Sequence, residues 1–310
     1  MKKLSVVIPM YFEEEVAYKC YERVKKVCTS LENMEHELVF VDDGSQDDTF
    51  YILKGIASKD SNDKVLSFSR NFGHQCAVTA GLQAITGDVV CIIDADLQDP
   101  PECIVEMLKL WQEGADVVYA KRKTREGESF FKLATAKAFY KFLSKMAEVD
   151  IPRDTGDFRL VDRKVIDAIN KMPEHNKFLR GLFSWMGFNQ VAFEYERHER
   201  EEGKTKYSMK KMLKLASDGI FGFSYKPISI IGKVGVGFMF VSFLTLTYFI
   251  LKLVFEFTFL SYIGLLVIFM TTFCTAAILL GLWIVGKYIA RIHDEVIARP
   301  QYIVKEKLNK

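Results

Sequence analysis

Apolar positions in the first 120 residues fall into short runs separated by longer amphipathic stretches. Runs rich in β-branched residues predict strands buried on both faces: Leu4–Ile8, Leu38–Val41, Val65–Phe68, Val89–Ile93 and Val117–Tyr119. The segments between them have the spacing and length of crossover helices: Glu13–Leu31, Thr49–Lys59, Gln75–Ile85 and Glu102–Gln112. Strands and helices in alternation predict a doubly wound α/β domain with a mainly parallel sheet.

Further along, the pattern predicts helices at Phe130–Met146 and Arg163–Lys171 and a charged loop at Arg197–Lys206. Two long apolar stretches follow, Val234–Leu251 and Phe257–Gly286, and neither contains a charged residue. Each is long enough for a bilayer, which needs roughly 20 apolar residues. They predict two transmembrane helices, and the alternative is a pair of buried core helices.

The flanks of the two apolar stretches predict their orientation. Basic residues lie before the first stretch and after the second: Lys210, Lys211, Lys214, Lys226, Lys233, Lys287 and Arg291. By the positive-inside rule, both outer ends and both chain termini are expected in the cytoplasm. Apolar residues recur at helical spacing from Met209 to Phe223, opposite lysines, which favours a helix lying on the membrane surface.

Composition limits the classes of function. The 310 residues carry a net charge of +2, from 42 basic and 40 acidic residues, so bulk charge does not indicate a nucleic-acid binder. The six cysteines show no close pairing with one another or with histidines, so neither a disulfide framework nor a zinc site is indicated. Met1–Ile8 is too short for the apolar part of a signal peptide, and the amino-terminal part is expected to stay in the cytosol.

Short segments made mostly of polar residues follow four of the predicted strands, at the edge where ligands bind in such sheets. They are Pro9, Tyr11 and Glu13; Asp42, Asp43, Gly44 and Ser45; Arg70, Asn71, Gly73 and His74; and Asp94, Ala95, Asp96, Leu97, Gln98 and Asp99. Asp94 and Asp96 are one residue apart, so both carboxylates can face one hard cation, although such a triplet is often only a solvated turn.

Two other strand ends allow alternative interpretations. Asp42 or Asp43 can accept hydrogen bonds from a ribose or a base, whereas Ser45 or Asp47 is expected to cap the helix that begins near Thr49. Pro9 and Tyr11 can shape a slot for a base, or the tyrosine can simply pack against the core.

Five motifs in order carry a family resemblance: PMYFEEE (Pro9–Glu15), VDDGSQDDT (Val41–Thr49), RNFGHQ (Arg70–Gln75), DADLQDPPE (Asp94–Glu102) and DTGDFRL (Asp154–Leu160). The chain resembles the inverting family 2 glycosyltransferases, and more narrowly the polyprenyl-phosphate glycosyltransferases. One departure is Phe12, where the family's first motif usually has asparagine. The Gln-x-x-Arg-Trp motif of the processive branch is absent, which favours a single transfer.

The resemblance implies a GT-A (Rossmann-like) fold and a nucleotide diphosphate sugar donor. It implies that Asp94 and Asp96 bind the metal, Mg²⁺ or Mn²⁺, and the phosphates, together with Ala95 and Gln98. The nucleoside would be held by Pro9, Tyr11, Glu13, Asp42 and Asp43. Arg122, Arg200 and Lys206 match cationic positions used on phosphates. Asp157 occupies the place of the family's candidate base, and its alternative role is to orient Arg159 or an acceptor hydroxyl.

We therefore expect transfer of a hexose, with inversion, from UDP-glucose or a related donor to undecaprenyl phosphate for cell-envelope glycan modification. Rival hypotheses are another membrane acceptor, such as diacylglycerol or a cell-wall polymer, and a non-catalytic membrane scaffold. The expected parts are a catalytic domain (1–207), an amphipathic helix (208–227), a transmembrane hairpin (228–290) and a cytoplasmic tail (291–310). Gly232, Gly235 and Gly237 would allow close helix contacts in a homo-oligomer.

Overall fold

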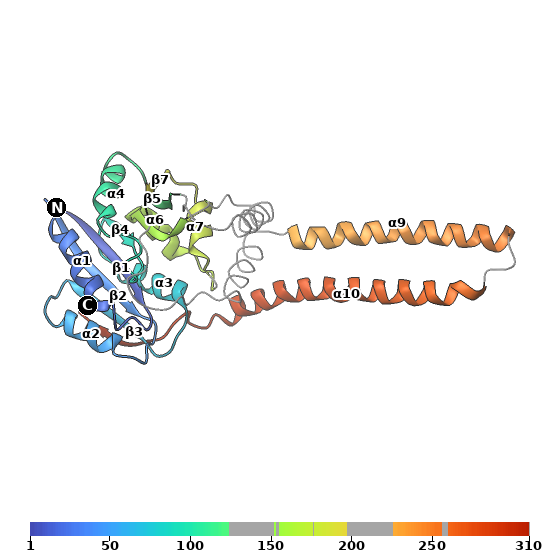
Figure 1. Ribbon diagram of the computed structural model, residues 1–310, viewed down its shortest axis with the longest axis horizontal. Coiled ribbons are helices and arrows are strands. Elements are labelled where there is room, and N and C mark those ends of the chain that lie inside the picture. The colour runs from blue at the N-terminus through green and yellow to red at the C-terminus, as the bar shows by residue number, and fades with distance from the viewer. Residues whose placement is uncertain (124–151, 153–154, 176, 197–225, 256–259, 310) are drawn as a thin grey trace.

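The computed structural model describes most of the chain, namely residues 1–123, 152, 155–175, 177–196, 226–255 and 260–309 (Figure 1). The helix predicted at 130–146, residues 208–225 of the predicted amphipathic helix, and the loop with Arg200 and Lys206 lie outside these residues. The structure therefore does not test these three predictions.

One eight-stranded sheet forms the centre of the α/β domain. Its strands are β1 (Lys2–Met10), β2 (Met34–Asp42), β3 (Asp63–Phe68), β4 (Val89–Ile92), β5 (Val117–Arg122), β6 (Thr155–Asp162), β7 (Gln190–Tyr195) and β8 (Val304–Leu308). The spatial order is β7-β5-β6-β4-β1-β2-β3-β8. Strands β1 to β4 pair in parallel, as do β5 and β7, whereas β6 and β8 run antiparallel to their neighbours.

Helices cover both faces of the sheet. Side chains alternate between the two faces along each buried strand, so both faces carry apolar residues that helices must bury. Leu4, Val6 and Ile8 of β1 pack with α1 (Ala17–Thr29), α2 (Thr49–Ala57) and α4 (Cys103–Gln112). Val7 of the same strand packs with α3 (His74–Ala84), α6 (Arg163–Lys171) and α7 (Leu179–Trp185) on the opposite face. The predicted mainly parallel, Rossmann-like α/β domain is confirmed.

Each of the five predicted strands is present, with boundaries shifted by a few residues, and so are the predicted helices that fall on described residues. The sequence did not predict β6, β7, β8 or α7. The position of β6 matters most for the site, because β6 lies between β4 and β5 and runs antiparallel to both. Its first residues therefore lie at the edge where β4 and β5 end.

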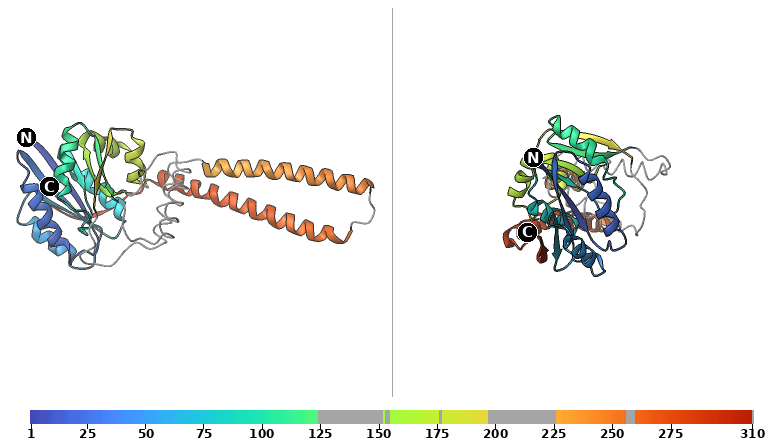
Figure 2. Two further views of the ribbon diagram at one scale, coloured as in Figure 1. Left: turned by 45° about the horizontal axis from the view of Figure 1, so that its top comes forward. Right: turned by 90° about the vertical axis from the view of Figure 1, so that its left-hand side faces the viewer.

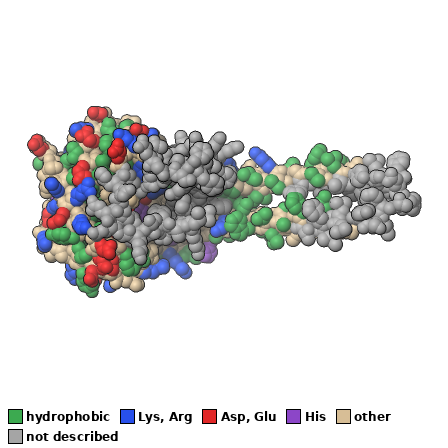
Figure 3. All heavy atoms as spheres, viewed as in Figure 1, with side chains coloured by type: hydrophobic (Ala, Val, Ile, Leu, Met, Phe, Trp, Pro, Cys, Tyr) green, Lys and Arg blue, Asp and Glu red, His purple; other side chains and the backbone are tan. Residues whose placement is uncertain are grey.

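Two long helices, α9 (Lys226–Phe255) and α10 (Leu260–Ile297), run side by side and project away from the α/β domain (Figures 1 and 2). They approach closely at Gly281, where an added Cβ would lie 3.4 Å from Cγ2 of Ile231. Many of their described apolar side chains are exposed, and Figure 3 shows them as hydrophobic surface along both helices. Among the described residues, one stretch, Phe273–Ile297, is long and apolar enough to cross a membrane.

After α10 the chain returns to the α/β domain and adds β8 to the edge of the sheet beside β3. The Tyr302 ring stacks on Phe68 with 4.9 Å between the centroids and an angle of 14° between the planes. The side-chain amide of Asn309 then contacts the carbonyl oxygens of Ala57, Asp60 and Asp63 at 2.7 to 3.0 Å. The segment expected to be a tail thus contributes to the sheet.

Candidate active site at the carboxyl edge of the sheet

The loops after β1 and β2 are joined by hydrogen bonds from backbone to side chain. Phe12 N–H donates to Ser45 Oγ at 3.0 Å, and Glu13 N–H donates to Thr49 Oγ1 at 2.9 Å. Ser45 is therefore not the helix cap that the sequence suggested, whereas Asp47 Oδ1 accepts from the N–H of Thr49 at the start of α2. These bonds fix Tyr11 and Glu13 beside the end of β2.

Asp42 and Asp43 are buried, and the protein engages both carboxylates. Asp42 accepts from Ser45 N–H at 3.0 Å and from Ser67 Oγ at 2.8 Å. Asp43 accepts from the N–H groups of Phe72 and Gly73, the shortest distance being 2.7 Å. Asp43 thus anchors the loop between β3 and α3, and its role toward a nucleoside remains a prediction.

The loop after β4 carries the predicted metal and phosphate residues. Asp94 is partly exposed, at 31% of its side chain, whereas Ala95 and Asp96 are buried. Asp96 Oδ1 accepts from Gln98 N–H at 3.2 Å, and Leu97 between them has a φ of 55°, in the left-handed region that side chains disfavour. The loop is therefore a tight turn that holds Asp94 and Asp96 at the edge of the sheet.

The loop after β4 that carries Asp94, Asp96 and Asp99, called the acidic loop below, fits a divalent cation. Burial raises the pKa of Asp94 to about 6; the nearby His74 opposes this rise, and the Asp157, Asp99 and Asp96 charges add to it. No group of three or more His, Cys, Asp or Glu arranged for a metal occurs within the described part of the chain. The pair Asp94 and Asp96 therefore suits a hard ion that takes its other ligands from a bound phosphate and water.

Asp157, near the start of β6, is the centre of a charged cluster. Arg180 of α7 contacts its two oxygens, with Nε 2.7 Å from Oδ1 and Nη2 3.1 Å from Oδ2. His74 Nε2 lies 3.1 Å from Oδ2 of Asp157 and 3.7 Å from Oδ1 of Asp94. His74 therefore connects the acidic loop after β4 with Asp157.

The charges in this cluster shift its pKa values. Burial alone would raise the pKa of Asp157, but the Arg180 charge and the His74 contact hold that pKa well below its usual range. Burial alone would lower the pKa of His74, but Asp157 and Asp94 raise it to about 9. Asp157 is therefore a carboxylate at neutral pH, and a poor proton acceptor in this arrangement.

Arg122, the last residue of β5, lies beside Gly156, the residue before Asp157. A Cβ on Gly156 would come within 2.9 Å of Arg122 Nη2, so a larger residue at 156 would shift this guanidinium from its present place. Arg122 Nε is 3.4 Å from Tyr195 Oη, and Tyr195 in turn donates a short hydrogen bond to Asp99 Oδ1. Arg122 is thus placed between the start of β6 and the acidic loop.

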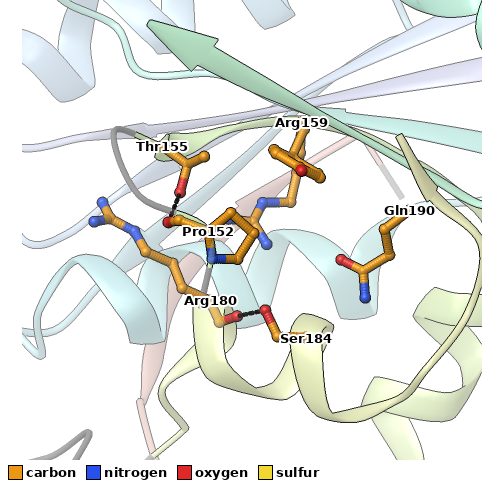
Figure 4. Close-up of a pocket in the computed structure, with 7 residues that line it drawn as sticks. Pro152, Thr155, Arg159, Arg180, Ser184 and Gln190 are labelled. Carbon is orange, nitrogen blue, oxygen red and sulfur yellow. Dashed lines mark hydrogen bonds between the residues drawn. The ribbon is translucent and has the colours of Figure 1, made fainter. Parts of the chain in front are cut away.

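Arg159 does not pair with the Asp157 carboxylate, contrary to one alternative that the sequence left open. Its Nε donates to the carbonyl oxygen of Asp157 at 3.3 Å, and its Nη2 donates to that of Gly156 at 3.1 Å. Arg159 and Arg180 line a cavity of about 10 Å³, room for about one water molecule, with Thr155, Ser184 and Gln190 (Figure 4). The guanidinium of Arg180 turns away from Gln190 toward the Asp157 side.

The structure thus brings together Asp94, Asp96, Asp157 and Arg122 of the predicted site, whereas Arg200 and Lys206 lie outside the described residues. Sequence reasoning assigned no role to Arg180, Tyr195 or His74. His74 belongs to a recognised motif and could have been found there, but Arg180 and Tyr195 had no local signal.

The chain is similar to known proteins over most of its length. The model of the family described as glycosyl transferase family 2 matches residues 5–169. The uncharacterised glycosyltransferase YkcC of Bacillus subtilis is 48% identical over 307 residues, covering 97% of this chain and 93% of its own. A prophage-derived bactoprenol glucosyl transferase of Shigella flexneri is 40% identical, covering 98% of each chain.

Solved structures are less similar in sequence. A mannosyltransferase from Pyrobaculum calidifontis, in complex with GDP-Man and Mn²⁺, is 14% identical with a TM-score of 0.49. The alignment covers 71% of this chain and 62% of that protein.

Proposed function

The chain belongs to glycosyl transferase family 2, and we propose that it transfers one hexose, with inversion, from a nucleotide diphosphate sugar to polyprenyl phosphate. UDP-glucose and undecaprenyl phosphate are the proposed pair, at the cytoplasmic face of the membrane. Similarity to bactoprenol glucosyl transferases over almost the whole chain supports the acceptor. The proposed role is the modification of cell-envelope glycans.

One observation carries the proposal, namely the contact through His74 between Asp94 of the acidic loop and Asp157 of β6. It joins the proposed donor site to the proposed acceptor site at one edge of the sheet. In the reaction, the bond between the anomeric carbon and the leaving phosphate breaks. A lipid phosphate oxygen bonds to that carbon from the opposite side, and a nucleoside diphosphate leaves.

The residues of the site suit this chemistry. Asp94 and Asp96 would hold Mg²⁺ or Mn²⁺, which, when bound, supplies positive charge to the leaving diphosphate. Arg122 would add a second cation for that developing charge, with Arg200 and Lys206 as further candidates from the sequence. A phosphate acceptor is already ionised at neutral pH, so the protein needs mainly to position it. The low pKa of Asp157 agrees with a role other than removing a proton.

The proposed acceptor explains the long helices, because a polyprenyl chain stays in the bilayer and the active site must come to it. We propose that α9 and α10 both cross the membrane as a hairpin. Lys226 and Lys233 of α9, and Lys287 and Arg291 of α10, occupy the ends of these helices that lie toward the catalytic domain (Figures 1 and 2). This placement supports a cytoplasmic catalytic domain with both termini on the same side.

The test uses the purified full-length chain with a radiolabelled donor, Mg²⁺ or Mn²⁺, and one acceptor per reaction. UDP-glucose, UDP-N-acetylglucosamine and GDP-mannose serve as donors, while undecaprenyl phosphate, diacylglycerol and isolated cell-wall polymer serve as acceptors. We expect label to enter the organic phase only with undecaprenyl phosphate. Label in diacylglycerol or polymer would favour the rival acceptors, and a folded protein that binds no donor in calorimetry would favour the non-catalytic scaffold.

A further inference from the structure

Arg180 is not part of any recognised motif, yet its guanidinium contacts both carboxylate oxygens of Asp157. The two groups form a bidentate pair, at 2.7 and 3.1 Å, and only 8% of the Asp157 side chain is exposed. Bidentate arginine–carboxylate pairs fix direction as well as distance, because both groups are planar. The pair therefore sets the orientation of the carboxylate and does more than neutralise its charge.

The element that carries Arg180 is itself held firmly. Leu179, Leu182 and Phe183 of α7 are buried against the sheet. The N–H of Leu179 donates to Oε1 of Gln75 at 3.1 Å, which ties the start of α7 to α3 directly after His74. Arg180 and His74 thus approach Asp157 from two helices that are bonded to each other.

Arg159, a second arginine near Asp157, does not duplicate the contact. Arg159 donates to the backbone carbonyl oxygens of Asp157 and Gly156, and its guanidinium lies 4.4 Å from the ring centroid of Phe183. It supports the backbone of β6, while Arg180 holds the side chain. Loss of Arg180 would leave the carboxylate with the His74 contact at Oδ2, about which it could rotate away from the direction in which it now points.

We propose that Arg180 is a positioning residue that acts through Asp157 on the transfer step; this inference rests on the proposed function. Since a lipid phosphate needs no base, the contribution of Asp157 depends on where its negative charge stands relative to the reacting groups. Arg180 fixes that place. A displacement of about 1 Å at such a group can slow a reaction ~100-fold.

The test is a double-mutant cycle on the full chain, with Arg180→Gln, Asp157→Asn and the two combined, each assayed with UDP-glucose and undecaprenyl phosphate. Arg180→Gln is expected to lower kcat ~10- to 100-fold, with less than about a 3-fold change in KM for the nucleotide sugar. The double variant is expected to be no slower than Asp157→Asn alone, because both changes remove the same interaction. Arg163→Gln serves as the control, since it breaks the exposed pair with Asp167 at 2.8 Å and two longer contacts with the carbonyl oxygens of Ile85 and Gly87.

Two results would overturn the inference: an Arg180→Gln enzyme with unchanged kcat, or losses in the double variant that multiply, which would mean that Arg180 acts independently of Asp157. If Arg180→Gln does not fold, Arg180→Lys replaces it, since lysine keeps the charge but lacks the bidentate geometry. Full kcat in Arg180→Lys would likewise contradict the inference. Absence of transfer in the wild-type protein would instead refute the proposed function, so the two failures are distinguishable.

Discussion

The backbone N–H of Gly73 lies within hydrogen-bonding distance of both carboxylate oxygens of Asp43, 3.2 Å from Oδ1 and 2.9 Å from Oδ2. Gly73 has a φ of 105°, which favours glycine, and it immediately precedes α3. Asp43 therefore holds the turn that delivers His74 to Asp94 and Asp157. The order of this turn depends on the charge of one buried carboxylate.

This dependence predicts a pH effect on the loop. Burial raises the pKa of Asp43 to about 6, even though the N–H groups of Phe72 and Gly73 lower it. Between pH 7 and pH 5 the carboxylate takes up a proton in the folded protein, whereas in an opened loop, with its ordinary pKa of 3.8, it stays charged. Because the folded-state pKa is raised, protonation stabilises the folded loop, and we expect the hydrogen-exchange protection of residues 70–76 to rise ~10-fold over this range. Asp43→Asn, which cannot titrate, should show the same protection at both pH values, and equal wild-type protection at pH 5 and pH 7 would contradict the prediction.

A second buried carboxylate stabilises the other end of the sheet. Glu37 accepts from Ser5 Oγ at 2.6 Å and pairs with Lys3 and Lys64 at 3.0 and 3.1 Å. Burial alone would raise its pKa, but these contacts and Thr86 lower it to about 2. Because the folded-state pKa is depressed, the stability that Glu37 contributes is present above its unfolded pKa, near 4.5, and is lost as pH falls toward 2.

Glu37→Gln should therefore lower the free energy of unfolding at pH 7 by about 3 kcal/mol. The difference from the wild-type protein should shrink between pH 4.5 and pH 2, in urea titrations followed by circular dichroism. A constant difference across that range would show that the carboxylate charge is not the cause.

Phe12 has a φ of 54°, in the left-handed region, where the family's first motif usually has asparagine. This conformation costs an ordinary side chain about 1–2 kcal/mol, and asparagine tolerates it better. Phe12→Asn and Phe12→Ala both lose the ring contact with Tyr11, whose centroid is 4.5 Å away. We expect the asparagine variant to be about 1 kcal/mol more stable than the alanine variant in thermal unfolding. Equal stability would mean that the strain at residue 12 is negligible.

Asn309 closes the C-terminal segment onto the domain, and its side-chain amide contacts three carbonyl oxygens. Its φ of 52° makes glycine the matched replacement, because glycine removes the amide without adding backbone strain. The amide has two N–H groups, so it can donate about two full hydrogen bonds to the three oxygens. Asn309→Gly should therefore lower the free energy of unfolding by about 2 kcal/mol and should increase proteolysis near β8. A variant with wild-type stability and wild-type resistance to protease would show that the amide contacts contribute little.

The sequence predicted the central parallel strands well, because Leu38–Val41 and similar runs are apolar on both faces. It did not predict β8, whose sequence, Val-Lys-Glu-Lys-Leu, is mostly charged and becomes a strand only by pairing with β3. In the site, Asp94, Asp96 and Asp157 follow from motifs. The contact of Arg180 with Asp157 spans 23 residues and depends on how α7 packs, which no local pattern records.

The most direct measurement of the central claim is the chemical identity of the lipid product. Purified wild-type protein, and Asp96→Ala as the control that loses a proposed metal ligand, are incubated with UDP-glucose, Mn²⁺ and undecaprenyl phosphate, and the lipid is analysed by mass spectrometry and NMR. We predict undecaprenyl phosphate carrying one hexose through a single phosphate, with inverted anomeric configuration, from the wild-type protein and none from a folded Asp96→Ala protein. A pyrophosphate-linked sugar, a phosphate-free glycolipid or full activity of Asp96→Ala would contradict the account.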